Sequence, residues 1–246
     1  MSGHSKWANI KNKKAKTDAA KGKIFTKIGR EIAVAAKAGA DPSTNSKLAD
    51  VIAKAKAANM PNDNIKRSIL KATGELGNVN YENLVYEGYG IGGSAVIVSS
   101  LTENKNRTVG EVRHIFDKYG GSLGTTGSVS FMFQNLGILV IERTVELDED
   151  TVMELALDAG ADDVVTEDDV YEIRTAPAAF SAVRNYFEDR GYTFIEASVQ
   201  MVPNDKITLN ADQLVTFNKM LDAFEDNDDV QDVYHNVELP EEDEEE

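Results

Sequence analysis

Apolar residues recur every three to four positions in the first third of the chain, which is the spacing of an amphipathic helix. Between Lys23 and Lys37 this repeat predicts one helix with a single buried stripe, made of Ile24, Phe25, Ile28, Ile32 and Ala36. A second helix is predicted around Leu48–Ala55, and a third where Pro61 can occupy a first helical turn. We therefore expect an all-helical region at the start of the chain.

Short apolar runs suited to strands appear beyond residue 80 and alternate with helical repeats. Residues 138–202 follow the order β-α-β-β-α-β, which is the ferredoxin-like pattern. A strand at 95–98, a helix at 108–119 and a strand at Ser128–Phe133 come before this segment, and a helix at 211–225 and a strand at 230–237 come after it. These flanking pieces together predict a second ferredoxin-like unit, with the first one inserted in its middle.

The predicted fold class is therefore α+β, with an N-terminal basic helical domain and two ferredoxin-like α/β domains, one inserted in the other. The helical domain is expected to cover residues 1–78, ending in a glycine-containing linker. The discontinuous α/β domain is expected at 79–134 and 206–240, and the inserted domain at 135–205. Residues 241–246 are predicted to be an acidic tail.

Charge is distributed unevenly along the chain, although its net value is −16. Residues 1–74 hold 14 lysines and two arginines against five acidic residues, a net charge of +11, so the remainder carries −27. A basic part on an acidic protein is a candidate for binding a polyanion. The chain has no cysteine, which excludes disulfides and thiolate sites, and no apolar run approaches the length of a membrane helix. We therefore expect a cytoplasmic protein with no membrane partner.

The strongest functional signal is the basic arm, by which we mean residues 1–30, with nine cations and Asp18 as the one acid. Phosphates would relieve the repulsion among these cations and release condensed counterions, which favours a nucleic-acid partner. The alternative is that the arm docks on the acidic part of its own chain or stays solvated. The predicted nucleic-acid-binding residues are Lys6, Trp7, Lys11, Lys13, Lys14, Lys16, Lys21, Lys23, Lys27 and Arg30. For Trp7, stacking on a base and anchoring the arm to the helices both stay open.

Other motifs favour structural interpretations. The segment Gly88–Gly93 formally matches a dinucleotide fingerprint, but an apolar strand follows it where that fingerprint needs a helix. We therefore interpret it as a turn and expect no cofactor.

The remaining polar residues predict neither catalysis nor a metal site. The three histidines, His4, His114 and His235, are far apart in the sequence and lack partners at metal-ligand spacing. The acidic cluster Asp222–Asp229 lacks the spacing of a calcium loop and is expected to be a solvated helix end. No serine or threonine lies in a nucleophile-elbow pattern, so we expect no catalytic residue, no enzyme activity and no metal.

Long ungapped blocks are spread over essentially the whole chain. They are Met1–Ile10, Gly22–Lys27, Met60–Ile65, Tyr86–Gly90, Asn106–Val109, Val112–Phe116, Gly127–Phe131 and Asp229–Asn236. Together they resemble the YebC/PmpR family of probable transcriptional regulatory proteins. The chain departs from the family pattern at Ile91, where the family has a proline.

The resemblance implies a helical domain followed by two α/β domains, and a cytoplasmic DNA-binding transcription factor without catalytic residues. It also implies an alternative, because related proteins, including a mitochondrial translational activator of a cytochrome oxidase subunit, act in translation at the ribosome. Two hypotheses follow: a regulator that binds promoter DNA, or a translation factor that uses the same arm on rRNA or tRNA. The single arginine of the arm favours the second, since reading of base edges favours Arg, Asn and Gln. The family description favours the first, and the oligomeric state stays open.

Overall fold

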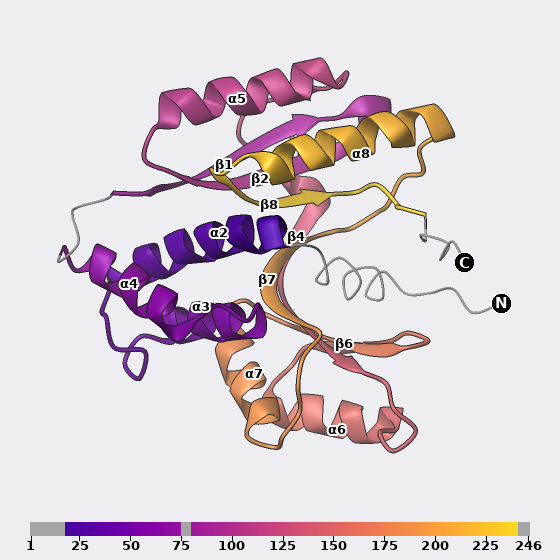
Figure 1. Ribbon diagram of the computed structural model, residues 1–246. Helices are drawn as coiled ribbons and strands as arrows, with labels where there is room; N and C mark the ends of the chain where they lie inside the picture. Colours follow the sequence, from indigo (N-terminus) through magenta and orange to yellow (C-terminus); the bar gives the residue numbers. More distant parts are fainter. Residues whose placement is uncertain (1–17, 75–79, 241–246) are drawn as a thin grey trace. The chain divides into compact units, whose positions relative to one another are not determined.

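The computed structural model describes residues 18–74 and 80–240 (Figure 1). Contacts divide this part of the chain into two compact units. The larger unit holds residues 18–134 and 202–239, and the smaller unit holds residues 135–201. Among the described residues, no helix combines the length and the apolar character that crossing a membrane requires.

The helical region of the larger unit consists of α2 (Asp18–Ala36), α3 (Ser46–Ala57) and α4 (Asn62–Ala72). Its core gathers apolar side chains that the repeat places on one face of each helix, among them Ile28, Ile32, Leu48, Ala55 and Ile65. The predicted stripe is confirmed at Ile28, Ile32 and Ala36, whereas Ile24 is exposed.

Asn45 fixes the turn between α2 and α3. Its side chain accepts a hydrogen bond from the backbone N–H of Leu48 (3.1 Å), which caps the N-terminus of α3. The amide of the same side chain donates to the carbonyl oxygens of Ala35 (2.9 Å), in the last turn of α2, and of Gly39 (2.8 Å), in the turn that follows. One side chain therefore satisfies backbone groups at both helix ends.

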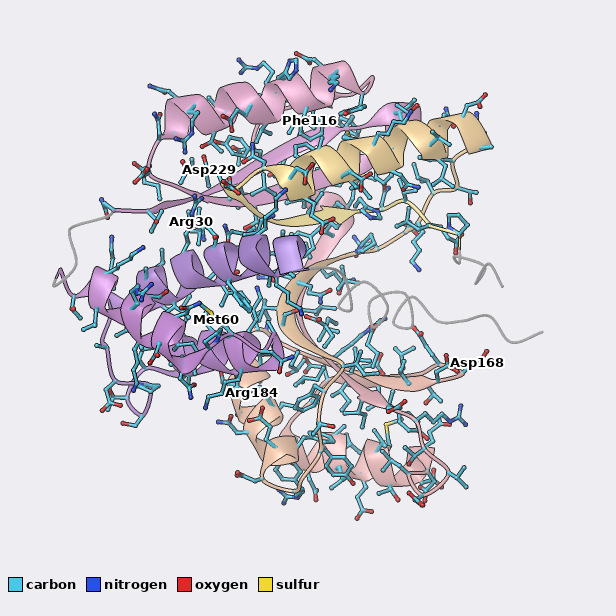
Figure 2. The ribbon with its side chains drawn as sticks, in the orientation of Figure 1. Arg30, Met60, Phe116, Asp168, Arg184 and Asp229 are labelled. Carbon is cyan, nitrogen blue, oxygen red and sulfur yellow. The ribbon has the colours of Figure 1, made fainter. Side chains whose placement is uncertain are left out.

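The first sheet of the larger unit has the strand order β3-β1-β2-β8, and all its neighbours are antiparallel. Its strands are β1 (Glu82–Tyr89), β2 (Ala95–Thr102), β3 (Ser122–Leu123) and β8 (Val230–His235). Helices α5 (Lys105–Lys118) and α8 (Ala211–Asp226) lie together on one side of it (Figure 1). Phe116 of α5 and Phe224 of α8 meet edge to face, with ring centroids 5.3 Å apart, and both are fully buried (Phe116 is labelled in Figure 2).

This first sheet is a ferredoxin-like sheet whose strands are permuted in the sequence. One βαβ half consists of β2, α5 and β3, and the other consists of β1, α8 and β8. The central strands of the sheet are β1 and β2. In the ferredoxin-like chain order, the strand in the position of β1 would lie between β3 and α8. Here β1 comes first in the chain. Between β3 and α8, the sequence instead contains the smaller unit.

The second sheet has the strand order β5-β6-β4-β7, and β6 pairs antiparallel with both β4 and β5. Its strands are β4 (Phe133–Glu142), β5 (Asp163–Thr166), β6 (Val170–Thr175) and β7 (Glu196–Pro203). The order β4-α6-β5-β6-α7-β7 includes helices α6 (Glu149–Ala159) and α7 (Phe180–Glu188). Its core contains Leu139, Ile173, Val152 and Phe187, from β4, β6, α6 and α7. The predicted fold class, with two ferredoxin-like units and one inserted in the other, is confirmed.

Two local predictions differ from the structure. Strand β1 is absent from the prediction, because its alternation is interrupted by Glu87 and by the glycines that follow it. The predicted strand Ser128–Phe133 is wrong: a short 3-10 helix spans Ser130–Met132, and β4 begins only at Phe133. The backbone N–H groups of this segment bind the Glu87 carboxylate, so they are not available for a strand pairing.

Glycines let β1 approach its neighbours closely, and one of them gives a stability prediction. A Cβ at Gly88 would lie 2.6 Å from the carbonyl oxygen of Ser122 and 2.9 Å from the buried Phe116 ring. Gly88→Ala should therefore lower the free energy of unfolding by about 1–3 kcal/mol. The matched change Gly110→Ala adds a Cβ to helix α5 with no atom within 4 Å, and should raise it by about 0.5–1 kcal/mol. Urea denaturation of both variants checks this, and destabilisation of equal size at the two sites would contradict it.

Candidate nucleic-acid interface

The predicted binding residues divide into two groups. Four of them, Lys21, Lys23, Lys27 and Arg30, lie on α2. The other six lie outside the described residues, and they are Lys6, Trp7, Lys11, Lys13, Lys14 and Lys16. The phosphate-binding role of the ten residues therefore stays a prediction, and the structure describes only the neighbourhood of α2.

Two lysines of α2 contact the acidic C-terminal end of α8. The ammonium of Lys23 donates to the carboxylate of Asp226 at 2.7 Å, and that of Lys27 donates to the carbonyl oxygen of Glu225 at 2.9 Å. The bond to Asp226 raises the pKa of Lys23, whereas burial lowers the pKa of Lys27. The Lys23–Asp226 pair is exposed on both sides, so solvent screens it and we expect it to contribute little to stability. Docking of arm cations on the chain's own acidic part, one of the two alternatives from the sequence, thus occurs at these positions.

Arg30 is bound more firmly than either lysine. Its guanidinium donates to the carboxylate of Asp229 at 2.7 Å, and only 17% of the Arg30 side chain is exposed (Figure 2). The guanidinium nitrogen that bonds Asp229, Nη1, also donates to the carbonyl oxygens of Leu101 (3.1 Å) and Asp228 (2.6 Å). The guanidinium also lies 5.5 Å from the ring centroid of Tyr81. These contacts tie α2 to the first sheet.

Asp229 is the centre of this network. Its Oδ2 accepts hydrogen bonds from the guanidinium of Arg107 (2.7 Å), and from the hydroxyls of Thr108 (2.9 Å) and Thr102 (3.1 Å). Burial alone would raise the pKa of Asp229, but the bonds from Arg107, Arg30 and the two threonines hold it below its usual value. The carboxylate is only 4% exposed, so the expectation of a solvated acidic helix end is wrong at Asp229. The signal that identifies it in the sequence is the apolar strand beginning at Val230.

Exposed cations on α3 and α4 were not among the predicted binding residues. Within the described part of the chain, five of them make no hydrogen bond or ion pair: Lys47, Lys56, Lys66, Arg67 and Lys71. Lys54 differs, because it donates to both oxygens of Glu31 at 2.9 and 3.0 Å. The helical region therefore carries exposed cations besides those that hold α2 in place.

The two other motifs stay structural in this fold. Strand β2 follows the glycines of Gly88–Gly93, where the dinucleotide fingerprint needs a helix directly after its glycines. His114 lies exposed on α5, and Nδ1 of His235 accepts a hydrogen bond from the N–H of Val237 at 3.2 Å. Among the residues that the structure describes, no three His, Cys, Asp or Glu side chains gather as metal ligands would.

Comparison with known proteins gives consistent matches over nearly the whole chain. A model of the TACO1/YebC N-terminal domain matches residues 5–75, and a model of the TACO1/YebC second and third domains matches residues 81–237. A probable transcriptional regulatory protein of Acetivibrio thermocellus is 62% identical over 96% of this chain and 98% of its own length. One of Clostridium novyi is 59% identical over 98% of this chain and 99% of its own.

A solved structure supports the fold directly. The crystal structure of a conserved hypothetical protein from Aquifex aeolicus matches with a TM-score of 0.81 and 40% sequence identity. The match covers 94% of this chain and 96% of that one.

Proposed function

Because the chain belongs to the TACO1/YebC family, we propose that it is a nucleic-acid-binding regulator of gene expression that acts in the cytoplasm. Its relatives carry the name probable transcriptional regulatory protein, which describes a regulator rather than an enzyme. The observation that carries the proposal is the contrast between a +11 charge over residues 1–74 and a −27 charge over the rest. Such a contrast directs a polyanion to one part of the molecule and repels it from the other.

The contacts of α2 narrow this proposal to a smaller set of cations. Lys23, Lys27 and Arg30 are bonded to the end of α8 and the loop that follows it. We assign these three residues chiefly to holding α2 in place. Phosphate contact falls to the lysines of residues 6–16 and to the exposed cations of α3 and α4.

The target that the arm fits best is a structured RNA, with promoter DNA as the family-based alternative. Eight of the nine arm cations are lysines, and an ammonium binds phosphate as a mobile point charge. Specific reading of a duplex needs side chains that bond base edges, and each good pair discriminates by about 1–3 kcal/mol. A lysine arm supplies affinity with little sequence information, so selectivity would come from the shape of the target, as is usual for RNA.

A competition assay at about 150 mM salt tests the target. We expect a promoter fragment and scrambled DNA of equal length to compete with the bound nucleic acid almost equally, and structured RNA to compete better. A promoter preference of about a thousandfold or more over scrambled DNA, as specific regulators have, would instead support the DNA-binding alternative. Sedimentation of cell lysate then places the protein with ribosomes, with DNA or with neither.

A further inference from the structure

A buried carboxylate fixes the conformation of residues Gly124–Met132, which we call the clamped loop. Glu87 of β1 is 5% exposed, and its Oε1 accepts the backbone N–H of Gly127 at 2.8 Å. Its Oε2 accepts the N–H groups of Val129 (2.9 Å) and Ser130 (2.8 Å). Burial alone would raise the pKa of Glu87, but these three bonds hold it below its usual value.

Further hydrogen bonds fix both ends of the clamped loop. Gly124 donates its N–H to the carbonyl oxygen of Glu87 (2.8 Å), and the Tyr89 hydroxyl donates to that of Ser128 (3.0 Å). At the other end, Asn204 donates its backbone N–H to the carbonyl oxygen of Met132 (2.9 Å). The side-chain amide of Asn204 donates to the carbonyl oxygen of Phe131 (3.3 Å). The backbone around Phe131 is therefore held by specific bonds on both sides.

The Phe131 ring is nevertheless exposed. Its exposed fraction is 71%, the largest of any phenylalanine or tyrosine among the described residues, and Tyr89 follows with 38%. Glu87 and Tyr89 alternate with Gly88, whose Cα faces Phe116 on the helix-covered side of the sheet. The clamped loop thus lies over the opposite face of central strand β1. The Phe131 ring is therefore held at the surface by a fixed backbone, where a planar partner can reach it.

The surroundings of Phe131 distinguish between kinds of partner. From Tyr119 to Ile141 the sequence contains no Asp, Glu, Lys or Arg, in a chain where these make up 28% of residues. Residues 119–141 themselves therefore add no charge beside the ring, and the carboxylate that the clamped loop binds, Glu87, is buried. A basic protein partner would need exposed acidic residues, and residues 119–141 supply none.

We propose that the clamped loop is a stacking platform on which Phe131 receives an unpaired base of a folded RNA, an inference that rests on the proposed function. RNA-binding domains stack unpaired bases on exposed aromatic side chains. Phe131 offers such a side chain from the clamped loop, which covers the face of β1 opposite α5. Stacking accepts every base, so the platform distinguishes unpaired from paired nucleotides rather than one sequence from another. It supplies the selectivity for shape that the lysine arm lacks.

The test compares an RNA hairpin that carries 2-aminopurine in its loop with a fully paired duplex of the same stem. Phe131→Ala should weaken hairpin binding by about 5- to 150-fold, leave duplex binding unchanged, and abolish the quenching of 2-aminopurine on binding. Phe131→Trp should retain affinity and quenching, whereas Phe131→Leu, which keeps an apolar side chain, should lose both. Leu157→Ala is the matched control, because Leu157 of α6 is 67% exposed but lies in the smaller unit.

The outcomes separate the two proposals. Wild-type binding that Phe131→Ala leaves unchanged, or weakens equally for hairpin and duplex, would overturn the platform and leave the proposed function standing. A wild-type protein that binds neither RNA nor DNA would overturn both. Retention of affinity by Phe131→Leu would show that apolar contact, not stacking, holds the RNA, and would also overturn the platform.

Discussion

Replacing Lys11, Lys13, Lys14 and Lys16 with glutamate should abolish nucleic-acid binding and leave both α/β units folded. The change reverses four charges of the basic arm, and each lost phosphate contact also removes the release of a condensed counterion. If the wild-type protein contacts about six phosphates, the slope of log affinity against log salt concentration should be near −5. Filter binding over a range of salt concentrations measures both quantities.

A matched variant separates the position of the charges from their number. Lys105, Lys118, Lys206 and Lys219 are the four lysines outside residues 1–74. Changing these four to glutamate alters the net charge by the same amount, yet we expect the affinity to fall far less. Equal loss in the two variants would mean that only total charge matters, and a wild-type salt slope near zero would reject phosphate contact altogether.

The sequence predicts the helices and the fold class because burial periodicity is local. Ile28, Ile32 and Leu48 recur at helical spacing, and each is buried where the repeat places it. The predicted strand at Ser128–Phe133 fails for a reason that is not local. Val129 and Phe133 are buried as an alternating strand requires, but Glu87, about forty residues earlier, binds the N–H groups of Val129 and Ser130.

The candidate site was predictable only as a charge pattern. Helical spacing places Arg30 off the buried stripe, which alone indicates a solvated cation. Its actual partner, Asp229, lies 199 residues further along the chain, and the local spacing of apolar residues cannot predict a pair so far apart in the sequence. Asp229 was likewise interpreted from its acidic neighbours. A buried ion pair between distant segments has no signature in either segment alone, so the structural role of both residues emerged only from the fold.

Asp229→Ala should be the most destabilising of the single substitutions considered, lowering the free energy of unfolding of the larger unit by about 3–5 kcal/mol. The carboxylate accepts bonds from Arg30, Arg107 and two threonine hydroxyls, and its removal leaves the largely buried Arg30 without its anion. Asp226→Ala is the matched control, because its pair with Lys23 is exposed and its loss should change the free energy of unfolding little. Urea denaturation that resolves the two units should show the loss in the larger unit only.

The difference in the free energy of unfolding between wild type and Asp229→Ala should depend on pH, which gives a second check on the Asp229 network. The folded state holds the pKa of Asp229 below its usual value, so the unfolded chain binds the proton more readily than the folded one. The stability that Asp229 contributes is therefore fully present above about pH 4, near the usual pKa of an aspartate, and is lost as the pH falls through the lower, folded pKa. The difference between wild type and Asp229→Ala should shrink on acidification and should not change between pH 6 and pH 8. A difference that grows as the pH falls would contradict a charged Asp229 as the centre of the network, because only the ionised carboxylate can neutralise Arg30 and Arg107 together.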